Sequence, residues 1–116
     1  MRRETAKFLQ DVLDAGRLIE SFVRTKSLVE YRTEIMLRLS VEREFIIVGE
    51  ALTRAFKLEL GAVQHLTGLR QIIGFRNVLV HGYSSIDDAT VWEVTQVDLP
   101  ILLREVQTLL ATAPAP

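Results

Sequence analysis

Apolar residues recur at alternating intervals of three and four along most of this 116-residue chain, which places them on one face of a helix. One such stripe lies within residues 4–24, a longer one within 33–55, and two more within 67–82 and 98–110. The spacing of the apolar residues within 91–97 does not distinguish a helix from a strand, and we expect a helix there. The first two stripes consist of Leu9, Val12, Gly16, Ile19 and Val23, and of Leu37, Val41, Phe45, Val48, Leu52 and Ala55. With no β-hairpin signal or internal repeat, the sequence predicts an all-α, up-and-down bundle of four main helices plus short helical turns.

Several polar residues indicate where these helices begin and end. Ser27 and Glu30 have the spacing of a capping box, which predicts a short helical turn. Thr33 is expected to cap the long second helix, and Asp98, two residues before Pro100, to cap the last one. The third helix is expected to start near Thr67 and to end at Gly82. Its inward-facing residues would be Leu69, Ile72, Ile73 and Val80.

Composition limits the classes of protein and of site. Apolar residues make up 48% and charged residues 25% of the chain, the balance of a folded domain, so we expect one domain over residues 1–112. The Ala-Pro tail, 113–116, is expected to fray. Without cysteine there is no disulfide or thiol nucleophile, and two histidines leave little for a metal site. No metal and no cofactor are therefore expected.

The formal net charge is −1, which does not produce the overall basic field of a non-specific nucleic-acid binder. The charge is nevertheless segregated: residues 54–81 hold four basic side chains and one acidic one, and residues 82–105 hold one basic and five acidic. This pattern suits RNA at one surface and a basic partner or sister subunit at another. No apolar run is long enough to cross a membrane, and no export signal is visible, so a cytoplasmic protein is expected.

Polar side chains gather at the end of the predicted third helix. Helical spacing places Arg70, Gly74, Asn77 and His81 in one stripe that can reach a phosphate. Arg76 lies about 140° around the helix from His81. The two side chains therefore meet only through the length of the arginine, a loosened last turn, or a neighbouring subunit.

Purely structural roles are open for the same residues. Arg76 could pair with a carboxylate such as Glu50 across the bundle. His81 could simply be a residue that the helix dipole stabilises at the negative, C-terminal end of its helix. Asn77 could be a surface amide, and Tyr83 could cover the core. The two remaining candidates are assigned no chemistry: His65 lies among neutral residues, and Trp92 is expected to anchor the core.

The string Arg76-Asn77-x-Leu79-x-His81-Gly82-Tyr83 resembles the signature of the HepT-like branch of the HEPN superfamily. The resemblance covers most of the chain, with both termini outside it. Its further features are an amphipathic first helix, a long second helix ending near Gly49-Glu50-Ala51, Val91-Trp92 and Asp98-Leu99-Pro100. The resemblance implies a dimeric helical bundle that acts as a metal-independent ribonuclease toxin, with Arg76 and His81 at the active site.

The resemblance also implies a partner, a minimal nucleotidyltransferase antitoxin that transfers AMP to the tyrosine here numbered Tyr83. The chemistry agrees with it, because metal-free RNA cleavage needs a base for the 2′-hydroxyl and a cation for the phosphate. His81 can serve as the base and Arg76 as the phosphate clamp, with Asn77 and Arg70 positioning the phosphate or the RNA. A two-fold dimer would supply a second histidine as the acid.

Two other functions are compatible with the sequence. The chain could be a non-catalytic partner of a minimal nucleotidyltransferase that binds a nucleotide or presents a substrate in the same groove. It could also be a plain dimeric scaffold, in which Arg76 forms a buried ion pair and His81 is dispensable.

Overall fold

The computed structural model describes residues 1–82 and 86–112, and over these ranges every regular element is helical. The predicted all-α bundle is therefore confirmed. In chain order the elements are α1 (Arg3–Val23), α2 (Leu28–Thr33), α3 (Ile35–Leu58), α4 (Leu60–Val63), α5 (Leu69–His81), α6 (Asp88–Glu93), the π-helical turn η2 (Val94–Asp98) and α7 (Leu99–Ala111). The tail expected to fray, 113–116, lies outside the described residues.

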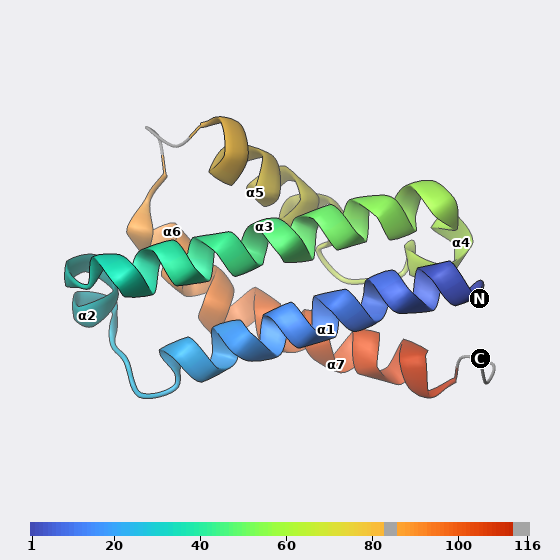
Figure 1. Cartoon of the computed structure of the whole chain (residues 1–116), viewed down its shortest axis with the longest axis horizontal. Coiled ribbons are helices and arrows are strands. Elements are labelled where there is room, and N and C mark those ends of the chain that lie inside the picture. The colour runs from blue at the N-terminus through green and yellow to red at the C-terminus, as the bar shows by residue number, and fades with distance from the viewer. Residues whose placement is uncertain (83–85, 113–116) are drawn as a thin grey trace.

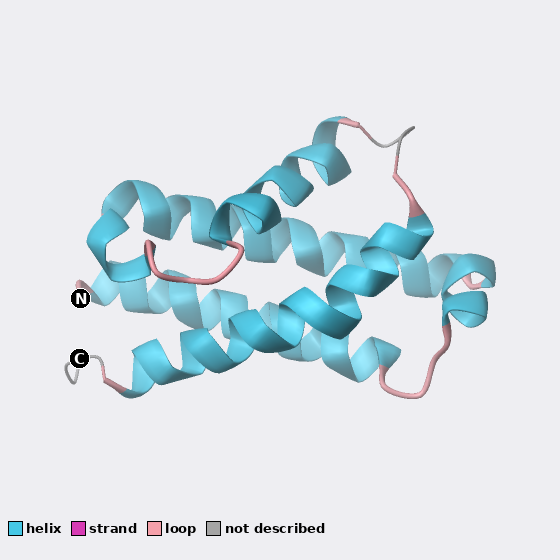
Figure 2. Ribbon diagram, turned by 180° about the vertical axis from the view of Figure 1, so that it is seen from behind, coloured by secondary structure: helices cyan, strands magenta, loops and turns pink. Residues whose placement is uncertain are grey.

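The two longest helices, α1 and α3, lie side by side and form the layer nearest the viewer in Figure 1. Helix α7 packs on α1, whereas α5 packs on α3 and is inclined to it. Seen from behind, α6, η2 and α7 form one run across the bundle (Figure 2). Among the described residues no helix combines the length and apolar character that a membrane crossing requires.

The stripes predicted for the first two helices form the core. All five stripe residues of α1 and all six of α3 are buried where the two helices meet their neighbours. This agreement is expected, because a helix with one apolar face gains most by turning that face inward. Trp92 also has its predicted core role, since its ring lies 5.8 Å from the ring of the fully buried Tyr31.

The boundary signals had mixed outcomes. The capping box is confirmed: Ser27 Oγ accepts the backbone N–H of Glu30, and a Glu30 carboxylate oxygen accepts the backbone N–H of Ser27. The prediction for Thr33 is wrong, because its hydroxyl donates to the carbonyl of Val29 and belongs to the last turn of α2. Helix α3 instead follows Glu34, whose backbone is extended and whose side chain makes no cap.

The prediction that Asp98 caps the last helix is also wrong. Asp98 has helical backbone angles, makes no capping hydrogen bond, and lies within a run that is helical from α6 to α7. The Leu99 N–H donates to the carbonyl of Val94, five residues earlier, which is the π-helical pattern. This wider turn carries the helix into Pro100, so no cap is needed there.

Helix α5 begins after Gly68 and ends at Gly82, near the predicted limits. Leu69 and Ile72 are buried as predicted, and Ile73 is partly buried. Val80 was expected to face inward but is 37% exposed, and Leu79 is buried in its place. The reason is geometric, because Leu79 comes seven residues, or about two full turns, after Ile72 and so faces the same side of α5. Val80 is the next residue and points about 100° away from Leu79.

Helices α3 and α5 approach most closely at Gly49. A Cβ atom at this position would overlap the Cβ and Cγ of Arg76, which are too near the backbone to move aside. Glycine at position 49 therefore sets how closely α5, and every side chain on it, lies to α3.

We predict that Gly49→Ala lowers the free energy of unfolding by about 1–3 kcal/mol, the usual cost of overpacking a close contact. Gly74→Ala is the matched control, because Gly74 lies within α5 and a Cβ there meets nothing within 4 Å. That variant should gain about 0.5–1 kcal/mol from helix propensity. Urea unfolding of the two variants measures both changes, and equal effects would show that the Gly49 contact is not tight.

Candidate functional site

Arg76 lies on the face of α5 that meets α3 and is held at two points. Its Nη2 atom lies 2.7 Å from Oε2 of Glu50, and its Nη1 donates to Oδ1 of Asn77 at 3.0 Å. The pairing with Glu50 considered from the sequence is therefore present. The Nε atom is buried and has no hydrogen-bond partner among the described residues. Because a guanidinium carries five N–H donors, Arg76 keeps donors for a further anion.

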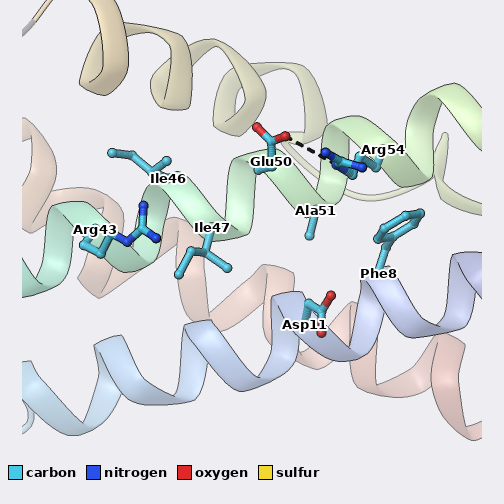
Figure 3. A pocket seen from close by; sticks show the side chains of 8 residues that line it. All are labelled: Phe8, Asp11, Arg43, Ile46, Ile47, Glu50, Ala51 and Arg54. Carbon is cyan, nitrogen blue, oxygen red and sulfur yellow. Dashed lines mark hydrogen bonds and ion pairs between the residues drawn. The ribbon is translucent and has the colours of Figure 1, made fainter.

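Glu50 connects Arg76 to a second arginine. Its Oε1 lies 3.3 Å from Nε of Arg54, one helical turn further along α3. Figure 3 shows the Glu50 carboxylate on the side of α3 that faces α5, with its contact to Arg54 as a dashed line. Its side chain is 44% exposed, so the cluster opens to solvent. From the sequence, Glu50 was considered only as a structural partner of Arg76. The sequence feature that could have indicated a larger role, positioning Arg76, is that Glu50 directly follows Gly49.

An open groove of about 430 Å³ lies beside Glu50 between α1 and α3 (Figure 3). Its walls combine apolar side chains with charges of both signs. The residues that line it are Phe8, Asp11, Arg43, Ile46, Ile47, Glu50, Ala51 and Arg54. The candidate site thus adjoins a surface able to take a partner of mixed charge.

His81 is the last residue of α5, and its side chain is exposed. Its ring makes no hydrogen bond to any other described residue, whereas Arg76 contacts Glu50 and Asn77. The helix stays regular to its end, because the Gly82 N–H donates to the carbonyl of Val78 at 2.8 Å. A loosened last turn therefore does not bring Arg76 to His81.

The stripe predicted along α5 is confirmed as a surface: Arg70, Gly74, Asn77 and His81 are all exposed. Arg70 lies at the opposite end from His81, with its guanidinium carbon 5.7 Å from the centre of the Phe56 ring. Tyr83, the position at which a nucleotide is expected, lies outside the described residues. His65, assigned no chemistry, is exposed in the connection between α4 and α5.

Two carboxyl groups away from the site have displaced pKa values. Burial raises the pKa of Glu42, with Asp88 adding to the effect. The backbone N–H of Arg2 and the Thr5 hydroxyl lower the pKa of Glu59 by donating to its carboxylate. Among the described residues, no three His, Cys, Asp or Glu side chains are grouped as metal ligands would be.

Comparison with known proteins gives one consistent result. Over 106 residues the chain is 28% identical to the protein of Methanocaldococcus jannaschii named "Putative RNase MJ1380", covering 91% of this chain and 96% of that one. It is 25% identical over 109 residues to "Probable ribonuclease HepT" of Thermococcus cleftensis, covering 94% of this chain and 98% of the relative. No solved structure shows a significant match.

Residues 12–109, which include α3, all of α5 and the Arg76–His81 segment, match the family described as ribonuclease HepT-like. The chain therefore belongs to the ribonuclease HepT-like family.

Proposed function

We propose that this chain is a metal-independent ribonuclease toxin of a toxin–antitoxin pair, with Arg76 and His81 as its catalytic residues. The observation that carries the proposal is the state of Arg76. Its guanidinium is fixed by Glu50 and Asn77 but keeps further Nη donors, on the same helix as an exposed histidine.

The reaction that fits these side chains uses the 2′-hydroxyl of the RNA as the nucleophile. His81 takes the proton of that hydroxyl as its oxygen attacks the adjacent phosphorus. Arg76 stabilises the added negative charge on the phosphate oxygens. The bond to the 5′-oxygen breaks, and that oxygen takes a proton from a second acid, leaving a 2′,3′-cyclic phosphate and a 5′-hydroxyl.

A homodimer would supply that second acid as the His81 of the other copy. The groove beside Glu50 supports such a pairing, because Arg43 and Glu50 lie symmetrically about Ile46 and Ile47 on α3. If two α3 helices pack antiparallel about a two-fold axis between these isoleucines, Arg43 of each copy faces Glu50 of the other. The arginine clusters of both copies would then lie at one shared interface.

The proposed antitoxin is a minimal nucleotidyltransferase that transfers AMP to Tyr83. Tyr83 is two residues from His81 in the chain. A nucleotide attached there carries a phosphate that can compete with RNA for Arg76. The rival proposal, a non-catalytic partner of the nucleotidyltransferase, uses the same residues and cleaves nothing.

Purified wild-type protein should cleave RNA in the presence of EDTA. His81→Ala should lower the rate by about 10²–10⁴-fold through loss of the base, and Arg76→Lys by about 10²-fold through loss of the planar fork. Gel analysis of the fragments and of their termini measures this. His65→Ala is the control, as the other histidine of the chain.

Mixing wild-type chains with His81→Ala chains tests the sharing of the site between subunits. A mixed dimer holds one His81, so a site that needs the histidines of both copies lacks either its base or its acid, and the mixed dimer should cleave far more slowly than half the wild-type rate. A mixed dimer that keeps about half of the wild-type activity would show that each site uses the histidine of one copy alone. If the wild type leaves RNA intact while still binding its nucleotidyltransferase, the rival proposal replaces the ribonuclease.

Glu50→Gln should lower the cleavage rate by about ten- to a hundredfold with little change in KM, because the arginine loses the charge that orients it. Glu44→Gln on the same helix is the matched control, since Glu44 has no ion pair among the described residues. Circular dichroism should show both variants folded. A rate unchanged or raised in Glu50→Gln would mean that Glu50 does not position Arg76 for catalysis.

Tyr83→Phe should stay toxic in bacteria that also express the nucleotidyltransferase, because the acceptor hydroxyl is gone. Wild-type protein from the same cells should gain the mass of AMP, and growth should recover. Tyr31→Phe is the control, as the other, fully buried tyrosine. Rescue of the Tyr83→Phe strain would remove the modification from the proposal.

A further inference from the structure

A second open pocket lies at the far end of α5 from His81, where α3 and α4 lead into that helix. Its volume is about 410 Å³. Leucines form its apolar part, and an aromatic ring, a guanidinium and two amides complete the wall. The lining residues are Phe56, Leu60, Gln64, Leu66, Gly68, Leu69, Arg70 and Gln71.

The polar groups of this pocket are available. Arg70 has no ion pair to a described residue and instead lies over the Phe56 ring at 5.7 Å. The Gln64 and Gln71 side chains are exposed, and neither makes a hydrogen bond within the described part of the chain. An aromatic face can stack on a base, and an arginine can bind a phosphate. Free amides can hydrogen-bond to the edge of a base.

The charges around the pocket strengthen this assignment. Arg54 and Arg76 are paired with Glu50, but Arg70 is not. Glu59, the acidic residue within 54–81, turns toward the start of α1, where it accepts from the Arg2 N–H and the Thr5 hydroxyl. Arg70 therefore forms no ion pair with a described carboxylate, and Glu105, the acidic side chain bonded near the pocket, is held by the N–H and hydroxyl of Thr67.

The position of the pocket relates it to the proposed active site. Arg70 and His81 share one exposed face of α5, and their eleven-residue separation spans about 16 Å. Gly74 lies between them, and even a Cβ there would meet nothing, so the path along the helix is open. Since a stacked strand rises about 3.4 Å along its axis for each phosphate, this length suits about five nucleotides, or fewer if the strand is extended.

We infer that the pocket of Phe56, Gln64, Arg70 and Gln71 binds one nucleotide of a single-stranded RNA, several nucleotides from the bond that is cut. The base stacks on Phe56 in the place where the Arg70 guanidinium lies in the structure, Arg70 moves off the ring to bind the phosphate, and the amides of Gln64 and Gln71 bond the edge of the base. The inference rests on the proposed function, because that function makes RNA the ligand.

The test compares a dinucleotide with an eight-nucleotide single-stranded RNA of the same sequence at the cleaved step. Binding is measured by fluorescence anisotropy with His81→Ala protein, and cleavage with otherwise wild-type protein. Phe56→Leu and Arg70→Gln should each weaken binding of the octamer about tenfold, within the range found for one stacked base. Phe56→Leu should leave cleavage of the dinucleotide, which is too short to reach the pocket, as in the wild type.

Two controls separate the pocket from general effects. Phe56→Tyr keeps an aromatic face and should bind the octamer as the wild type does. Arg17→Gln removes a charge from the exposed surface of α1 and should leave octamer affinity within about twofold. Circular dichroism of each variant establishes that the fold is kept.

The possible results distinguish this inference from the proposed function. Octamer affinity unchanged in both pocket variants, with RNA still cleaved, overturns the pocket alone. Octamer binding that falls in both variants, in a protein that cuts no RNA, supports the pocket and overturns the ribonuclease. A wild-type protein that binds no single-stranded RNA overturns both.

Discussion

The contact between Gly49 of α3 and the base of the Arg76 side chain determines the geometry of the candidate site. With no Cβ at Gly49, the first carbons of Arg76 can lie directly against the backbone of α3. Glu50 is the next residue along that helix, so its carboxylate comes within 2.7 Å of the guanidinium. A larger residue at position 49 would displace α5, and with it His81 at one end and Arg70 at the other. The ion pair between Arg76 and Glu50 thus depends on the absence of a side chain at position 49.

Periodicity predicted the parts of the fold that depend on a single helix face. The stripes of α1 and α3 were read correctly because burial of one apolar face is a property of the local sequence. Boundaries were harder, because a capping side chain has competing partners. Thr33 bonds back into α2, and a π-helical turn carries the chain through Asp98 without a break. Where α3 and α7 begin thus depends on contacts that the spacing of residues along one helix does not predict.

The candidate site shows the same division between local and long-range information. The sequence identified Arg76, Asn77 and His81 as a cluster, and helical geometry placed Asn77 and His81 on the exposed stripe. It offered Glu50 as a partner of Arg76, but 26 residues separate them, so only the packing of α3 on α5 settles the pair. The structural contacts of Arg76 are compatible with the chemical role proposed for it, because its five donors exceed the two contacts that hold it.

The fold also redistributes the charge that the sequence shows as one basic segment. Glu50, which precedes that segment, pairs with Arg54 and Arg76, whereas Glu59 within it turns away toward α1. Within residues 54–81, the cations without an ion pair among the described residues are therefore Lys57 and Arg70, and not Arg76 of the motif. For the RNA substrate proposed above, these two cations attract at longer range than Arg76, because the charge of Arg76 is already paired with a carboxylate. In that proposal, a phosphate has to come close along α5 before it can share Arg76 with Glu50.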